Sequence, residues 1–463
     1  MSDFVVVGAG TAGCVVAAGL SAAGASVTLL EAGPPDRRPE VRVPAAFPRL
    51  FGSEYDWAHE TVPQPGLDGR ALYWPRGRTL GGSSAVNAQI WTRGHHADYD
   101  DWDIPGWTHK ELAPLFERAE RAVRIGPLRT PHPSTADFLA ACADSGLPPL
   151  ADGEGYGAVQ VTQDRGRRWS SADAYLRPAL ERPGLTVVTG AEAEWVVLEG
   201  GRAVGVAYRD SGGAARVARA SREVVLAAGA IGSPALLLRS GFGDPAEGAA
   251  FPLPDVGRNL QDHLMAPLVF DAGERAERVR PSSNNAEALA FLRTPGADAP
   301  DIEFLWMPVP FLDHGRGTLG TGCTLGVVLL RPESRGRITL DDGRPVIDPG
   351  YLSAPADVAA LTAGVEAAHR LLARLADWTG APLTPVAASS SPAALRASAQ
   401  TLYHPVGTCR IGSVVDERLR VRGAAGLRVA DVSVCPLIPR AHTQAAAYVI
   451  GERAVDLILE EGP

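Results

Sequence analysis

The chain has 463 residues, of which 45% are hydrophobic, and it carries a formal net charge of -9. A chain of this length and composition can bury a large core and is too long for one ordinary domain, so we expect two. The acidic balance gives no basic footprint, which argues against nucleic acid and anionic membranes as partners.

The targeting and cysteine patterns favour the cytoplasm. No charged and apolar leader precedes the strand that begins at Phe4, and we find no apolar run of about 18 residues. The five cysteines are scattered without CxxC or metal-ligand spacing, and their odd number leaves at least one unpaired. We therefore expect a soluble cytoplasmic protein that spans no membrane and binds no metal ion.

The first predicted elements are a strand, a glycine turn and a helix. An apolar run from Phe4 leads into a glycine-rich turn, and residues 14–23 continue as a helix. In such a turn the glycines permit the tight bend, the approach of a pyrophosphate and the packing of helix on strand, and the helix N-terminus faces the phosphates. The pattern assigns dinucleotide binding to Gly8, Ala9, Gly10, Thr11, Ala12 and Gly13. A plain turn before a core helix is the alternative.

A second strand, residues 26–30, ends in Glu31. A carboxylate at this distance from the glycine turn can accept hydrogen bonds from ribose hydroxyls, and it argues against a 2′-phosphate. We therefore add Glu31 and Ala32 to the predicted cofactor site.

Residues 77–94 form a long glycine- and serine-rich segment. The backbone N–H groups and hydroxyls of such a segment can line a pyrophosphate and a flavin ring system. This segment is a more specific indication of cofactor binding than the first glycine turn. Its candidate cofactor contacts are Arg78, Leu80, Gly82, Ser83, Asn87 and Ala88.

The rest of the chain alternates between helical and extended patterns. Helices are predicted over residues 109–123, 356–375 and 445–459 from their apolar spacing. Strands are predicted over residues 186–189, 223–228, 301–306, 324–330 and 336–340.

Two histidines near the C-terminus are candidates for proton transfer. The unperturbed pKa of histidine, about 6.5, suits it to act as a general base near neutral pH. His404 precedes a Pro-Val-Gly turn. His442 precedes Thr443 at the start of the last helix, where it could cap the helix as easily as touch a substrate.

Four segments together make the chain resemble the glucose-methanol-choline (GMC) flavoprotein oxidoreductases, in particular the aryl-alcohol oxidases. Residues 77–100 fit the family's first signature. Residues 229–243 fit the second signature apart from Phe242, where the family prefers an aliphatic residue. Residues 255–263 and 403–412 follow in the family's order, so the resemblance covers almost the whole chain.

The resemblance implies FAD as the cofactor. Members that link the flavin covalently through the first signature carry a histidine just before its asparagine, and here that position is Val86, before Asn87. Noncovalent FAD is therefore expected. The further contacts assigned to the cofactor are Ala193, Ala228, Gly229, Asp431, Val432 and Thr443.

The resemblance also implies oxidation of a primary alcohol to an aldehyde. His404 matches the catalytic histidine, which takes the hydroxyl proton while a hydride leaves the same carbon for flavin N5. His442 matches a second position that is Asn or His in the family. Oxygen or another acceptor would reoxidise the flavin. A hydroxynitrile lyase, or a flavoprotein dehydrogenase serving a redox-carrier partner, is the alternative.

Aromatic residues suggest a benzylic substrate. Trp91, Trp306 and Tyr403 are the candidates for the wall of an aromatic pocket, although aromatic residues in strands are as often plain core. Alternation along a strand predicts that Glu303 faces away from the side of Phe304. His263 is expected to be structural or adjacent to the cofactor.

The predicted fold class is α/β, with a Rossmann-like FAD-binding domain interleaved with a substrate domain built on an antiparallel sheet with helices. We assign residues 1–95, 174–262 and 401–463 to the FAD-binding domain. Residues 96–173 and 263–400 are assigned to the substrate-binding domain. The sequence predicts no particular oligomeric state.

Overall fold

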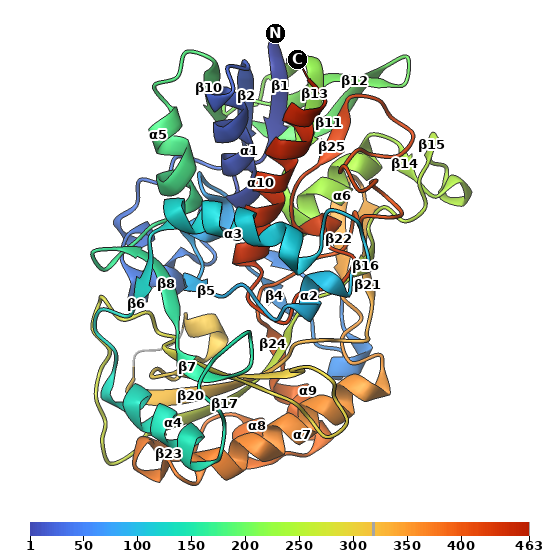
Figure 1. The fold of residues 1–463 in the computed structure, drawn as a ribbon. Coiled ribbons are helices and arrows are strands. Elements are labelled where there is room, and N and C mark those ends of the chain that lie inside the picture. Colours follow the sequence, from blue (N-terminus) through green and yellow to red (C-terminus); the bar gives the residue numbers. More distant parts are fainter. Residues whose placement is uncertain (317–319, 463) are drawn as a thin grey trace.

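Two seven-stranded sheets organise the protein (Figure 1). The structure is a computed structural model that describes residues 1–316 and 320–462. Both chain ends lie at the far end of the first sheet, and the second sheet lies at the opposite end of the molecule.

The first sheet has a parallel core with an antiparallel edge. Its strand order is β10-β2-β1-β13-β12-β11, and β25 also pairs with β13. β10, β2, β1, β13 and β25 run parallel, whereas β11 and β12 join antiparallel. The bounds are β1 Ser2–Val7, β2 Val27–Glu31, β10 Leu185–Thr189, β11 Glu192–Glu199, β12 Arg202–Arg209, β13 Ala215–Leu226 and β25 Leu427–Val429.

Helices pack on this sheet because its central strands are apolar on both faces. They are α1 (Thr11–Ala22), α6 (Gly229–Arg239) and α10 (Gln444–Glu460). α1 and α10 pack closely at glycines: a Cβ added at Gly451 would lie 2.9 Å from Cβ of Val15, and one added at Gly19 would lie 2.6 Å from a methyl carbon of Val455.

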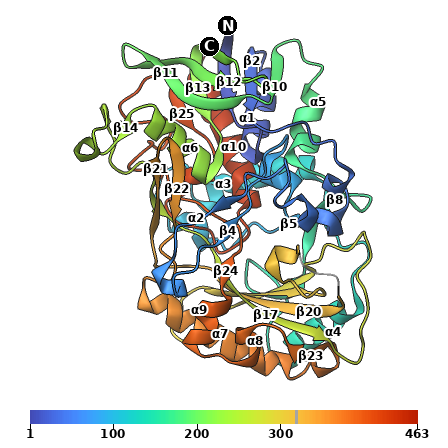
Figure 2. The same ribbon diagram turned by 180° about the vertical axis from the view of Figure 1, so that it is seen from behind.

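The second sheet is antiparallel and has helices on one face. Its strand order is β23-β17-β20-β19-β18-β7, with β24 paired to β17. The strands are β7 Gly155–Ala158, β17 Leu264–Ala272, β18 Ala288–Leu292, β19 Ile302–Met307, β20 Gly322–Leu329, β23 Thr379–Pro382 and β24 Gln400–Thr401. The helices are α4 Pro133–Asp144, α7 Pro355–Leu372, α8 Pro385–Ala388 and α9 Pro392–Ser398, and Figure 2 shows α7, α8 and α9 along the outer side of this sheet.

Side-chain alternation along β19 separates the two faces of the second sheet. Phe304 and Trp306 pack in the core under the helices. Leu305 and Met307 point the other way, into a smaller core with Met265 that borders a large cavity.

Smaller elements connect the two sheets. The helices are α2 Ala97–Asp100, α3 His109–Val123 and α5 Arg177–Ala179. The short strands are β3 His59–Glu60, β4 Tyr73–Trp74, β5 Ile90–Trp91, β6 Ile125–Pro127, β8 Gln160–Asp164, β9 Arg167–Arg168, β14 Phe242–Gly243, β15 Phe251–Pro252, β16 Arg258–Leu260, β21 Gly336–Asp341 and β22 Arg344–Asp348. Among the described helices, none is long and apolar enough to cross a membrane.

The predicted α/β fold class is confirmed, and the domain boundaries stay a prediction. α3, which the sequence assigned to the substrate-binding part, buries Leu112, Leu115 and Phe116 in the same core as α1 and α10. Trp107 also donates a hydrogen bond from Nε1 to the carbonyl of Glu417 (2.9 Å). We therefore propose that residues 96–123 belong with the FAD-binding part.

Candidate active site

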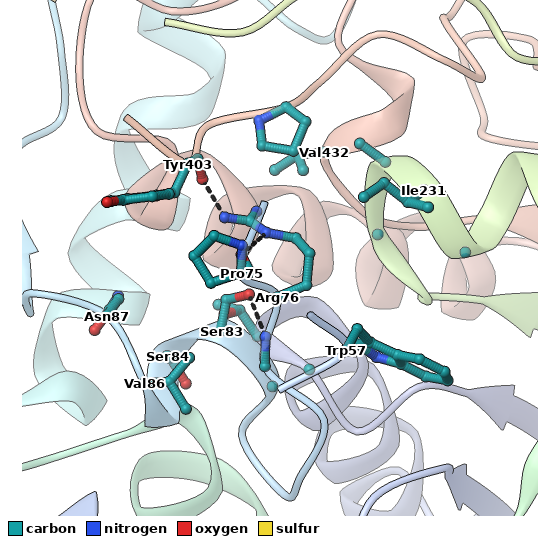
Figure 3. A pocket seen from close by; sticks show the side chains of 18 of the residues that line it. Trp57, Pro75, Arg76, Ser83, Ser84, Val86, Asn87, Ile231, Tyr403 and Val432 are labelled. Carbon is teal, nitrogen blue, oxygen red and sulfur yellow. Dashed lines mark hydrogen bonds between the residues drawn. The ribbon is translucent and has the colours of Figure 1, made fainter. Parts of the chain in front are cut away.

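A cavity of about 820 Å³ is lined by residues from both sheets and from the segments between them. The sequence-distant segments that line it begin near residue 7 and end near residue 447. Figure 3 shows Arg76 in this wall between Ser83 and Tyr403, with Asn87 and Val86 on the side away from Trp57.

The glycine turn after β1 opens onto the cavity. Gly8 has φ of 98°, and a Cβ there would lie 2.6 Å from the carbonyl oxygen of Ala227. A Cβ on Gly13 would lie 1.8 Å from the carbonyl oxygen of Gly8, so helix and turn pack too tightly for a side chain. A Cβ added at Gly10 would lie 3.9 Å from the carbonyl oxygen of Ala227, an ordinary contact, and Gly10 lines the cavity at the N-terminus of α1.

Glu31 is held at the end of β2 with its carboxylate on the cavity wall. Its Oε2 accepts a hydrogen bond from the N–H of Ala9 (2.9 Å), and its Oε1 accepts one from the N–H of Gly33 (2.8 Å). Burial raises the pKa of this carboxyl to about 7. The two N–H groups fix the direction of the carboxylate, and Ala32 and Ala193 line the cavity beside it.

The glycine- and serine-rich segment lies across the cavity from the first turn. A Cβ on Gly82 would lie 2.6 Å from Cα of Gly10, so the two turns meet almost backbone to backbone. The buried Arg168 donates to Oδ1 of Asn87 (2.7 Å) and to its carbonyl (2.6 Å), and thereby orients that amide. Gly82, Ser83, Asn87 and Ala88, four of the predicted cofactor contacts, line the cavity.

Four predicted cofactor residues support the cavity from behind. Within the described structure, Ala9, Gly13, Arg78 and Leu80 are not part of the cavity wall. Arg78 lies over the Trp57 ring (5.0 Å to the centroid) and pairs with Glu192 (3.5 Å).

Asp431 supports the cofactor site through its backbone neighbours. Its Oδ2 accepts hydrogen bonds from the N–H of Gly229 (2.9 Å) and the hydroxyl of Ser233 (2.6 Å), and its Oδ1 accepts one from the N–H of Ser433 (2.8 Å). The carboxylate is therefore engaged by protein donors. Ala228, Gly229, Val432 and Thr443 line the cavity around it.

These residues fit FAD. Part of the cavity wall is formed by the glycine turn at Gly8 and Gly10, and the α1 N-terminus beside it carries no side-chain cap. Uncapped N–H groups at a helix N-terminus suit a pyrophosphate, and a carboxylate at the end of the second strand suits a ribose.

His404 lies in the cavity wall just after β24. Its N–H donates to Oδ1 of Asp262 (2.7 Å), and its Nδ1 is 2.9 Å from Nδ1 of His263. Burial, followed by electrostatic interactions with His442, His263 and Arg76, holds the pKa of His404 well below its usual range. The direction of this shift favours the neutral ring at pH 7, in which one ring nitrogen carries a lone pair.

His442 lies beside His404 with its ring nearly perpendicular. The two ring centroids are 4.9 Å apart at an interplanar angle of 81°. Nε2 of His442 lies 2.9 Å from Oε1 of Glu303, within hydrogen-bonding distance, and Nδ1 is the other ring nitrogen. Both histidines line the cavity, so the structure brings the two predicted catalytic residues together.

Glu303 and Arg76 were not among the predicted site residues. Glu303 faces away from Phe304 as alternation predicted, and that side is the one that meets His442. Arg76 lines the cavity and donates to the carbonyls of Pro75 and Tyr403. Two features of the sequence could have pointed to these residues. Glu303 is a carboxylate in an otherwise apolar strand, and Arg76 directly precedes the glycine-rich segment.

The expected aromatic wall needs correction. Trp306 stacks on Phe138 with centroids 5.4 Å apart, on the far face of the second sheet. Trp91 donates to Glu120 (3.1 Å) and packs on Tyr448. Tyr403 does line the cavity, and the other aromatic side chains in this wall are Phe47, Phe51, Trp57 and Phe311. Strand alternation does not say which face meets a cavity, so the tryptophans were chosen wrongly.

The fold and the site together define an oxidoreductase that binds a dinucleotide beside a histidine pair. Residues 2–265 and 332–451 match the N-terminal and C-terminal models of the GMC oxidoreductases. An uncharacterized GMC-type oxidoreductase of Mycobacterium bovis is 44% identical, with 99% of each chain covered. The "alcohol dehydrogenase [acceptor]" of Pseudomonas putida is 37% identical over 100% of this chain and 96% of its own.

A solved structure agrees with these relatives. The pyridoxine 4-oxidase from Mesorbium loti superposes with a TM-score of 0.92 at 31% identity, and all of both chains is covered. The chain therefore belongs to the GMC oxidoreductase family. The predictions of the family, of FAD as cofactor and of an enzyme that oxidises CH–OH donors are confirmed.

Proposed function

We propose that the protein oxidises primary alcohols with an aromatic body to the corresponding aldehydes. Bound FAD supplies the hydride acceptor. Nε2 of His404 takes the hydroxyl proton, and His442 holds the hydroxyl oxygen. The observation that carries the proposal is the pair of perpendicular imidazoles in the wall of the same cavity as the glycine turns.

The wall near the histidines supports an apolar substrate. Its side chains belong to one small core, whose cavity-lining members are Phe47, Ile90, Met265, Ala286, Leu305, Met307, Phe311 and Leu402. The Phe47 and Phe311 rings lie 6.3 Å apart, and the Phe51 and Tyr403 rings 5.8 Å apart. Aromatic rings in the wall favour a substrate with an aromatic or apolar body over an extended polar chain.

The relatives support an alcohol substrate of this kind. The pyridoxine 4-oxidase is named for an aromatic alcohol, and the Pseudomonas putida relative for alcohols and an acceptor. We carry these substrate classes to this chain as part of the proposal, with oxygen or another acceptor reoxidising the flavin.

The test is anaerobic flavin bleaching with two alcohols of matched size. Benzyl alcohol and cyclohexylmethanol differ in ring aromaticity and little in volume. We expect benzyl alcohol to reduce the flavin faster at saturation, because a benzylic carbon releases hydride more readily, and to bind more tightly. Equal rates and affinities, or a preference for choline or sugars, would contradict the aromatic substrate.

We also propose that FAD is held without a covalent bond and that the protein works in the cytoplasm. Val86 lies before Asn87 in the cavity wall, at the position that the family uses for covalent attachment. All five cysteines are free thiols and buried, which suits a reducing compartment. Acid precipitation should release the flavin, and flavin retained in the pellet would contradict the noncovalent assignment.

A further inference from the structure

His263 contacts the ring of His404, and the proposed function gives this contact no role. It lies between Asp262 and β17, and its side chain is completely buried. Its Nδ1 lies 2.9 Å from Nδ1 of His404, and its Nε2 lies 3.1 Å from the carbonyl oxygen of Leu330. The two rings meet edge to face, with centroids 5.1 Å apart.

The positions of the ring hydrogens follow from these two contacts. A carbonyl oxygen only accepts, so Nε2 of His263 must carry a hydrogen. A neutral imidazole has one N–H, so Nδ1 of His263 is an acceptor. Burial lowers the pKa of His263 to about 3, which keeps this ring neutral.

The same reasoning extends to His404. Because Nδ1 of His263 accepts, Nδ1 of His404 must donate and therefore carries the hydrogen of that neutral ring. The lone pair of His404 is then on Nε2. The neighbouring Asp262 holds the backbone N–H of His404, so consecutive residues hold its main chain and its ring.

We propose that His263 is a positioning residue that selects the Nδ1–H tautomer of His404 and so presents the Nε2 lone pair to the substrate hydroxyl. The inference rests on the proposed role of His404 as the base. In the reaction the substrate O–H bond breaks and its proton bonds to Nε2 of His404. The resulting imidazolium keeps Nδ1–H donated to His263, and His263 keeps its own hydrogen on Nε2.

The tautomer can be measured directly in the wild-type holoenzyme. Ring ¹⁵N chemical shifts distinguish a protonated from an unprotonated ring nitrogen, and the His404 signals are identified as those lost in His404→Asn. We expect His404 with hydrogen on Nδ1 and none on Nε2 at neutral pH, and His263 with the reverse pattern. A neutral His404 with its hydrogen on Nε2 would overturn the proposal, whatever any variant does.

Two substitutions of similar chemistry separate positioning from packing. In His263→Asn the side-chain oxygen can occupy the place of Nδ1 and still accept from His404. In His263→Gln the amide reaches the place of Nε2 and leaves His404 without its acceptor. His263→Leu removes both contacts.

We expect His263→Asn to reduce its flavin at least ~10-fold faster than the Gln and Leu variants at saturating benzyl alcohol, since a placed general base contributes about 10² to 10⁴-fold. The substrate dissociation constant should change less than the rate constant. The Gln variant should also show a mixture of His404 tautomers. A Gln variant as fast as the Asn variant would overturn the proposal.

Failure of this inference is distinguishable from failure of the proposed function. If His404→Ala keeps its rate of flavin reduction, His404 is not the base and the proposed function fails. If His404→Ala loses the rate but wild-type His404 carries its hydrogen on Nε2, only the role of His263 fails. If the His263 variants do not retain FAD, the ¹⁵N measurement of the His404 tautomer in the wild-type holoenzyme tests the role of His263.

Discussion

His442 is the residue to which we assign binding of the substrate hydroxyl. Its Nε2 is hydrogen-bonded to Glu303, which is itself fully buried, so the ring has a fixed orientation beside His404. The remaining ring nitrogen, Nδ1, is the atom that can hydrogen-bond a substrate hydroxyl.

Substitution of His442 tests this division of roles. His442→Asn should reduce its flavin faster than His442→Ala, because an amide still offers one hydrogen bond to the substrate hydroxyl. The rate constant is measured at saturating benzyl alcohol, which isolates chemistry from affinity when binding is fast. His96→Ala, at an exposed histidine, is the control and should match wild type. Equal rates for the Asn and Ala variants would remove the hydrogen-bonding role.

The pH dependence tests the environment of His404. The groups that lower its pKa besides burial are His442, His263 and Arg76, and the Asp262 carboxylate accepts its backbone N–H. Because the base acts when neutral, the flavin reduction rate should stay level as pH falls through about 6.5, the ordinary histidine pKa, and drop only at lower pH. We would measure it in the His442→Asn background, which removes the second imidazole.

Substitution Arg76→Gln, made in the same His442→Asn background, tests the contribution of a nearby positive charge to the pKa of His404. Removing one positive charge should raise the pKa of His404 and move the acid limb of the rate profile toward higher pH. If the acid limb of the rate profile of the His442→Asn enzyme were centred at or above pH 6.5, the lowered pKa of His404 would be contradicted.

At the scale of elements, the contact between α1 and α10 joins the two ends of the chain. Gly451 lets α10 approach Val15 and Ala12 of α1, and α1 carries the glycine turn at its start. The C-terminal helix also follows directly after His442 and Thr443. Close packing of these helices therefore sets the distance between the glycine turn and His442.

Gly451→Ala should lower the melting temperature. The added methyl would lie 2.9 Å from Cβ of Val15 and 3.0 Å from the carbonyl of Ala12. Overpacking of this kind costs about 1–3 kcal/mol, which offsets the roughly 1 kcal/mol that alanine gains over glycine in a helix. Gly126→Ala, where a Cβ meets nothing within 4 Å, is the control. Equal or higher melting temperature in Gly451→Ala would contradict the close packing.

The elements also show what the sequence could predict. The helix over residues 109–123 is confirmed at both ends, because Thr108 and Glu111 form a capping box at its start and its apolar spacing is strong. The sequence correctly placed Glu303 and Phe304 on opposite faces of β19, but it placed Trp306 on the cavity side, which is wrong. Alternation determines which side chains share a face of a strand and does not determine what that face contacts. The contact from His263 to His404 spans 141 positions, and no local pattern encodes it.

At the scale of the whole molecule, strand pairing brings the chain ends to one site. β1 and β25 flank β13 in the same parallel sheet, so the turn after β1 and the segment after β25 open at the same edge. The antiparallel sheet then closes the cavity with the face that carries Leu305 and Met307. The cofactor end of the cavity belongs to the first sheet and the apolar end to the second, which is how one cavity can hold both FAD and an alcohol.

The most direct test of the account is flavin reduction in His404→Ala. Purified wild-type and variant proteins carrying FAD are mixed anaerobically with saturating benzyl alcohol, and the loss of flavin absorbance is followed by stopped flow. We predict that the variant binds FAD and reduces it at least ~10²-fold more slowly, the lower range for removal of a general base. A variant that reduces its flavin at the wild-type rate would contradict His404 as the base.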